Sequence, residues 1–160
     1  MQVAYLLYDR FTALDITGPH EVFNSVPDVE SIFVGEKTGP YRNESDTLSI
    51  VADRSLDEVM APDILVIPGG FGTRALLDHE PLLDWIRAVD ETTTWTTSVC
   101  TGALLMAAAG LLDGRPATTH WLARETLAGL GANPVPDRVV FDGKYVTGAG
   151  VSAGIDMALT

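Results

Sequence analysis

Short apolar runs alternate with amphipathic stretches along the whole chain. Residues 3–7 and 64–67 are apolar at successive positions, a pattern typical of strands that are buried on both faces of a sheet. Residues 93–99 are rich in β-branched side chains and predict a third strand. Further strands are expected at residues 31–35, at residues 48–51 as a short edge strand, and at residues 139–141 and 145–147, a hairpin around Asp142-Gly143.

Segments in which apolar residues have helical spacing lie between these strands. This spacing predicts helices at about residues 17–26, 81–89, 102–109, 120–130 and 154–160. Strands that alternate with short helices indicate an α/β fold, with a mostly parallel sheet and helices on both faces. No repeat or linker interrupts the pattern, so we expect one domain over residues 1–160. Its last helix stops without a cap at Thr160, and we expect this helix to be truncated.

In a sheet of this kind, ligands bind beyond the carboxyl ends of the strands. The turns after Leu7, Ile67 and Val99 are therefore the expected place for a site. Each of these turns leads into residues that can carry chemistry.

Charge and cysteine content narrow the possible functions. The net charge of −12, with ten scattered Lys and Arg residues, argues against nucleic acid or an anionic membrane surface as a partner. A single cysteine permits no internal disulfide, and the N-terminus resembles no signal peptide, so we expect a cytoplasmic protein. Three dispersed histidines and one cysteine provide no metal-ligand spacing, so we expect no metal site.

The segment TSVCTGA at residues 97–103 carries the strongest chemical signal. It places Cys100 where a β-branched strand meets a helix of small residues, which resembles a nucleophile elbow. A thiol at a helix N-terminus is expected to have a lowered pKa. A buried structural cysteine is the alternative, since free cysteines are often buried.

Three other segments supply candidate partners for this thiol. Gly69 and Gly70 follow a predicted strand and could turn backbone N–H groups toward a ligand, although an ordinary tight turn is the alternative. Asp15 precedes a predicted helix, either as its N-cap or as a partly buried proton carrier with a raised pKa. His120 is either a catalytic base or a hydrogen-bonded structural residue.

Taken together, the segments LDITGP (14–19), VIPGG (66–70), TSVCTG (97–102), ATTHW (117–121) and TGAGVSAGID (147–156) resemble the ThiJ/PfpI superfamily. This flavodoxin-like group is related to class I glutamine amidotransferase domains. The resemblance covers essentially the whole chain and implies a three-layer sandwich and a homodimer. The pairing of Asp15 with Cys100-Thr101 resembles the isocyanide hydratase branch, which converts isocyanides to N-formamides without a cofactor.

The resemblance also implies roles for particular residues. Cys100 would be the nucleophile, Asp15 the general acid/base, and Thr101 would orient substrate or water. The Gly70 and Thr101 N–H groups would form an anion-stabilising pocket, and Gly69 and His120 would also contact a small-molecule substrate. A glyoxalase-type hydratase of 2-oxoaldehydes is an alternative. So is a non-catalytic ligand-sensing domain like that of AraC-type regulators.

Overall fold

A seven-stranded sheet forms the centre of the computed structural model, which describes residues 1–160. The strand order is β10-β11-β7-β6-β1-β2-β5, and every neighbouring pair is parallel except the β10–β11 hairpin. The strands of this sheet are β1 (Gln2–Leu7), β2 (Glu30–Gly35), β5 (Arg54–Ser55), β6 (Ile64–Ile67), β7 (Trp95–Val99), β10 (Val139–Asp142) and β11 (Tyr145–Gly148).

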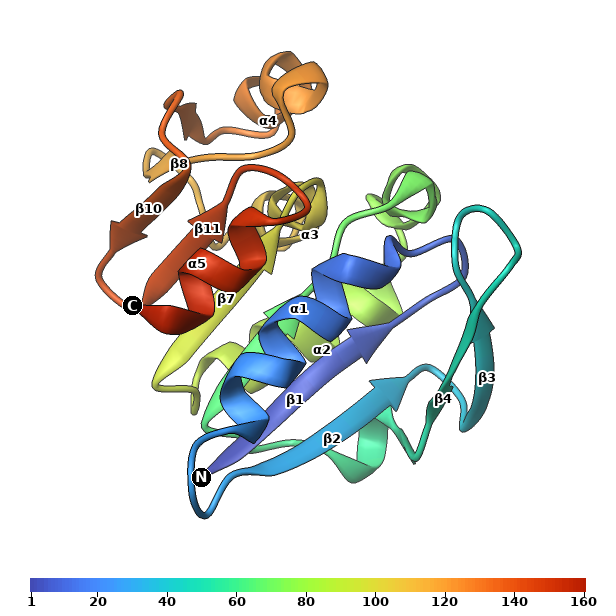
Figure 1. Ribbon diagram of the computed structural model, residues 1–160. Coiled ribbons are helices and arrows are strands. Elements are labelled where there is room, and N and C mark those ends of the chain that lie inside the picture. Colours follow the sequence, from blue (N-terminus) through green and yellow to red (C-terminus); the bar gives the residue numbers. More distant parts are fainter.

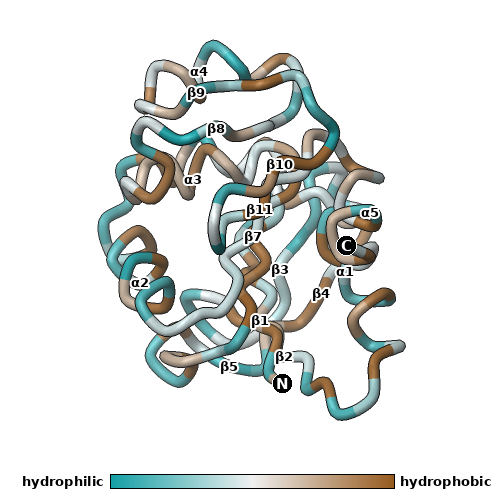
Figure 2. The backbone as a smooth tube through the Cα atoms, turned by 90° about the vertical axis from the view of Figure 1, so that its left-hand side faces the viewer, coloured by the Kyte–Doolittle hydropathy of each residue, from teal (hydrophilic) through white to brown (hydrophobic).

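Helices cover both faces of the sheet (Figure 1). Helices α1 and α5 lie against each other on one face, and α2 and α3 lie on the other (Figure 2). The helices are α1 (Ala13–Asn24), α2 (Glu80–Asp90), α3 (Gly102–Ala108), α4 (Arg124–Gly129) and α5 (Ala153–Leu159), with 3-10 turns η1 (Leu56–Glu58), η2 (Phe71–Leu76) and η3 (Trp121–Ala123). The α/β, flavodoxin-like three-layer sandwich expected from the sequence is therefore confirmed.

The two central strands confirm the interpretation of the unbroken apolar runs. All five of residues 3–7 in β1 and all four of residues 64–67 in β6 are buried. Because helices cover both faces, neither strand has a polar side, and the apolar residues stand at successive positions. None of the helices has the length and apolar character that crossing a bilayer requires.

Two small sheets lie outside the central one. β3 (Gly39–Arg42) pairs with β4 (Ser49–Ala52), and β8 (Pro116–Ala117) pairs with β9 (Asn133–Pro134). The strand expected at residues 48–51 therefore exists, but it belongs to a separate hairpin rather than to an edge of the main sheet. This β3–β4 hairpin becomes important for the site, because its connecting loop reaches the carboxyl end of β1.

The first helix begins earlier than predicted. Thr12 is extended (φ −85°, ψ 118°), and α1 starts at Ala13 rather than near residue 17. Pro19 therefore lies inside the helix, where it removes the N–H that would otherwise bond the Asp15 carbonyl. The interpretation of Asp15 as an N-cap is wrong, because Asp15 is the third residue of the helix.

Candidate functional site

Cys100 occupies a sharp turn between β7 and α3. Its φ of +56° is in the left-handed region, which non-glycine residues adopt only at a cost in free energy. Hydrogen bonds hold the backbone there: the Cys100 N–H donates to the Gly148 carbonyl at 2.9 Å, and the Thr119 hydroxyl donates to the Cys100 carbonyl at 2.8 Å. The nucleophile-elbow geometry inferred from the sequence is present.

The glycine turn after β6 packs directly on this elbow. A Cβ added to Gly69 would lie 2.5 Å from the Thr101 backbone nitrogen, so only glycine permits this approach. Gly70 has φ +139°, and its added Cβ would lie 2.3 Å from the Arg10 carbonyl oxygen. The turns after β1, β6 and β7 therefore meet at one place, as the sequence predicts.

Asp15 lies inside this junction. Its side chain is fully buried, and its Oδ2 accepts a hydrogen bond from the Gly69 N–H at 2.9 Å. Its other oxygen, Oδ1, is buried without a hydrogen-bond partner. Burial raises the pKa of Asp15 to about 7, with the nearby Glu44 carboxylate adding to the rise and the Gly69 N–H opposing it. A carboxyl group with this pKa exchanges its proton near neutral pH.

The Thr101 hydroxyl is engaged by the glycine turn. It accepts a hydrogen bond from the Gly70 N–H at 2.9 Å, and the Thr73 hydroxyl lies 3.3 Å away. The expectation that Gly70 and Thr101 N–H groups jointly stabilise an anion is therefore wrong for Gly70, whose donor is already used. Since the Gly69 N–H is bonded to Asp15, the turn anchors the site rather than binding an anion.

The expectation of a lowered thiol pKa is also wrong. Burial, together with the nearby Asp15 and Glu44 carboxylates, raises the pKa of Cys100 to about 12. Hydrogen bonds from the Thr101 N–H and hydroxyl oppose this rise without overcoming it. Helix α3 has only seven residues, so its dipole offers little to offset the burial. A thiol with this pKa is protonated near neutral pH, so it could act as a nucleophile only with the help of a base.

A cavity of about 200 Å³ opens directly onto the thiol. Its walls come from the β3–β4 loop, η2, the elbow and the segment around η3, and they are lined by Thr12, Glu44, Gly70, Phe71, Arg74, Cys100, Thr101, His120, Leu122 and Val151. Gly70 and Thr101 therefore line the cavity, and Asp15 and Gly69 lie next to it, bonded to each other beneath the elbow.

His120 lies in the wall of this cavity but is used in the local structure. Its Nδ1 accepts a hydrogen bond from the Leu122 N–H at 3.3 Å and so caps η3. No hydrogen bond links its ring to Cys100 or Asp15, so the geometry favours the structural interpretation of His120 over the catalytic-base interpretation.

Glu44 is a residue of the site that the sequence analysis missed. It reaches the cavity from the β3–β4 loop, and its Oε2 accepts a hydrogen bond from the Thr12 hydroxyl at 3.1 Å. Nothing in the pattern around Glu44 signals this position, because it depends on how the hairpin packs against residues 10–12.

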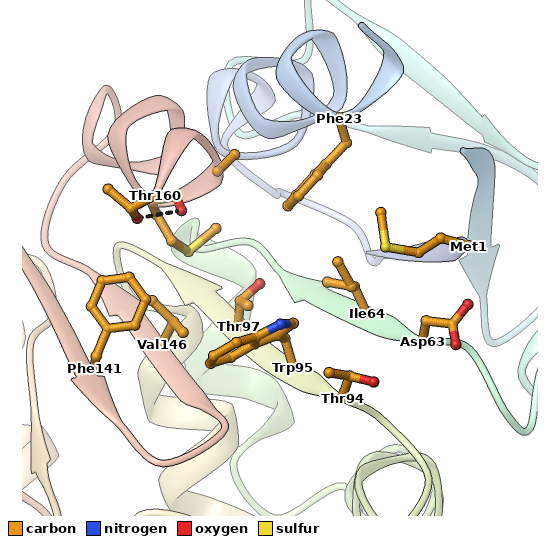
Figure 3. A pocket seen from close by; sticks show the side chains of 12 residues that line it. Met1, Phe23, Asp63, Ile64, Thr94, Trp95, Thr97, Phe141, Val146 and Thr160 are labelled. Atoms are coloured by element: carbon orange, nitrogen blue, oxygen red, sulfur yellow. Dashed lines mark hydrogen bonds between the residues drawn. The ribbon is translucent and has the colours of Figure 1, made fainter. Parts of the chain in front are cut away.

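A second, larger groove of about 600 Å³ lies at the amino ends of the central strands (Figure 3). Its lining is mainly apolar and includes Ile64 and Trp95, the first residues of β6 and β7, together with Phe23 and Phe141. Asp63 is its only ionisable side chain. Cys100 follows the other end of β7, so the Cys100 thiol faces the smaller cavity and not this groove.

Comparison with known proteins identifies the family of the chain. A model of the DJ-1/PfpI family matches residues 1–160. The chain is 42% identical over 160 residues to an isonitrile hydratase of Pseudomonas putida, covering all of this chain and 70% of that protein. It is 33% identical to the HTH-type transcriptional regulator CdhR of Pseudomonas aeruginosa, covering 72% of this chain and 34% of that protein.

A solved structure of a ThiJ/PfpI family protein from Pseudomonas syringae is similar throughout. The TM-score is 0.94 at 38% sequence identity, over 99% of this chain and 66% of that chain. The present chain therefore spans about two thirds of the length of this relative and about one third of the regulator. Because the family model matches all 160 residues and a relative is 42% identical over the same length, the chain belongs to the DJ-1/PfpI family.

Proposed function

We propose that the protein is a hydratase that adds water to a small isocyanide and gives an N-formamide, with Cys100 as nucleophile and Asp15 as proton carrier. One observation carries the proposal: the buried Asp15 has an unpartnered Oδ1 and is bonded to the same glycine turn that packs on the cysteine elbow. The similarity to an isonitrile hydratase supports the choice of substrate class. No step requires a metal or an organic cofactor.

The first step forms a covalent intermediate. Asp15, as carboxylate, takes the proton from the Cys100 thiol, and the sulfur attacks the terminal carbon of R–N≡C. Asp15 then gives that proton to the same carbon, which leaves a thioimidate, R–N=CH–S–Cys100. The thiol pKa of about 12 and the Asp15 pKa of about 7 mean that, between these values, the pair holds one proton. That single proton is the one transferred.

The second step consumes water. Asp15, ionised again, removes a proton from water while the water oxygen bonds to the thioimidate carbon, and the nitrogen takes that proton. The hydroxyl proton then passes to the sulfur as the C–S bond breaks. The products are R–NH–CHO and the free Cys100 thiol, so the enzyme returns to its starting state.

The pH dependence of turnover follows from Asp15. At pH values below about 7 the carboxyl is protonated and cannot accept the thiol proton. We therefore expect kcat/KM to rise with pH through an apparent pKa of about 7, measured by steady-state kinetics between pH 5.5 and 8.5. A profile that is flat across this range, or that falls as pH rises, would contradict the role of Asp15.

The decisive assay compares two classes of electrophile. Purified protein is incubated with an alkyl isocyanide while formamide is followed by absorbance, and a parallel reaction contains methylglyoxal. Turnover of the isocyanide alone supports the proposal, and turnover of methylglyoxal alone favours a glyoxalase-type hydratase. A ligand-sensing domain is the second candidate, favoured by the similarity to CdhR, and it predicts binding without turnover of either compound.

We also propose that the protein acts as a homodimer, as the family resemblance implies. Light scattering at micromolar concentration is expected to give twice the mass of one chain. A mass of one chain in a fully active sample would refute this assembly.

A further inference from the structure

Backbone hydrogen bonds join the loop that carries Glu44 to residues 10–11. The Glu44 N–H donates to the Phe11 carbonyl at 2.9 Å, and the neighbouring Asn43 forms a β-bridge with Phe11. The Arg10 N–H donates to the Arg42 carbonyl at 2.8 Å, which continues the same seam. The backbone that carries the Glu44 side chain is therefore fixed to residues 10–11.

One oxygen of this carboxylate is available to a ligand. Oε2 accepts the Thr12 hydroxyl, whereas Oε1 accepts no hydrogen bond from the chain. The side chain is half-buried in the wall of the cavity that contains Cys100. Its negative charge raises the pKa values of Cys100 and Asp15, so the carboxylate lies within electrostatic reach of the thiol.

The cavity lining also includes one cationic side chain, Arg74, which offsets the negative charge of Glu44 only in part. Arg74 comes from η2 on another wall and is solvent-exposed, and it forms no ion pair with Glu44. An exposed guanidinium is strongly screened by water, whereas a half-buried carboxylate is screened less. The net charge of −12 on the chain adds a field of the same sign as Glu44.

We propose that Glu44 is a specificity-determining residue, and that the cavity selects a substrate bearing a cationic amino group on the substituent attached to its isocyanide group. An ammonium group would donate to Oε1 and balance the charge of Glu44. A purely apolar substituent would displace water from Oε1 without replacing its hydrogen bond, which costs free energy. This substrate class rests on the proposed hydratase function, but the charge preference of the cavity can be measured without it.

Because Cys100 is the only cysteine, thiol labelling reports on this cavity alone. The reagents are 2-aminoethyl methanethiosulfonate, which is cationic, and its neutral counterpart 2-hydroxyethyl methanethiosulfonate. In both reactions the Cys100 sulfur forms a disulfide and methanesulfinate leaves, so the ratio of the two rates cancels any change in thiol reactivity.

We expect the wild-type protein to favour the cationic reagent and Glu44→Gln to reduce the ratio by roughly ten-fold, as loss of a charge-assisted contact predicts. Arg74→Gln, the matched control in the same cavity, should leave the ratio unchanged or raise it. Melting curves of both variants check that the fold is retained. A ratio in Glu44→Gln equal to that of the wild type would overturn the inference.

Turnover then separates this inference from the proposed function. The substrates are 3-(dimethylamino)propyl isocyanide and its uncharged isostere 4-methylpentyl isocyanide. A kcat/KM preference of the wild type for the amine, lost in Glu44→Gln, supports both. Turnover of both compounds with equal efficiency overturns the substrate class. If neither is hydrated while the labelling ratio still depends on Glu44, the hydratase proposal fails and the charge preference of the cavity stands.

Discussion

Asp15→Asn is expected to reduce turnover by about 10²–10⁴-fold, the usual contribution of a positioned proton carrier. The amide has nearly the same shape as the carboxyl, and its oxygen can still accept the Gly69 N–H that now bonds Oδ2. It cannot accept the Cys100 proton, so the thiol, whose pKa is raised to about 12, has no base. Steady-state kinetics with an alkyl isocyanide measures the loss.

The pH dependence of folding stability provides a control for this variant, because burying Asp15 makes the wild type less stable as pH rises. The pKa of Asp15 is about 7 in the folded protein against 3.8 unperturbed. Below about pH 3.8 the carboxyl is therefore protonated in both the folded and the unfolded chain, and its burial does not oppose folding through ionisation. As pH rises toward 7, the unfolded chain ionises first and stability is lost, by on the order of 4 kcal/mol in all.

Asparagine does not ionise and avoids this loss. The melting temperature of Asp15→Asn relative to the wild type should therefore increase between about pH 4 and 7 and remain constant above that range. Wild-type turnover in a correctly folded Asp15→Asn protein would exclude Asp15 as the proton carrier. A difference in melting temperature between Asp15→Asn and the wild type that does not change with pH would exclude a raised pKa of Asp15.

Cys100→Ser is expected to cause the larger loss, on the order of 10⁴-fold or more, because it removes the proposed nucleophile itself. The hydroxyl is a much weaker nucleophile than the thiol, and it lies in the same buried environment. Mass spectrometry of the wild type quenched during turnover should show a thioimidate adduct, seen as an added substrate mass. The serine variant should show no such adduct.

A third variant tests the strain at this position independently of chemistry. Cys100→Gly permits φ +56° without a steric cost, so it should melt no lower than Cys100→Ser although both are inactive. Residual activity of Cys100→Ser close to the wild type would refute the covalent mechanism.

Much of the site could be predicted because its signals are local. The β-branched run before Cys100 and the glycine after it indicate an elbow, and the structure shows why glycine is needed at position 102. A Cβ there would lie 2.2 Å from the Ile67 carbonyl oxygen, so α3 begins against β6. The parallel sheet follows from the buried strands, and it brings the three turns together whatever their separation in sequence.

The features that were missed depend on distant packing. Glu44 enters the site through the bridge between Asn43 and Phe11, and no periodicity around Glu44 encodes that contact. The start of α1 differs from the prediction because Pro19 suggests a first turn, whereas Pro19 is the seventh residue of the helix. The thiol pKa was misjudged because the sequence shows the helix dipole but not the burial or the two nearby carboxylates.

The β3–β4 hairpin forms its own small sheet, and within its loop the Asn43 side chain bonds Ser45, Thr47 and Leu48. Glu44 contacts Phe11 through its backbone N–H, which every residue except proline retains, and its side chain is not part of the hydrophobic core. New substrate preferences could arise here by single substitutions, with little loss of folding stability to restrict them. A small library that randomises residues 44–46, selected for growth on different isocyanides, is the natural way to diversify this scaffold.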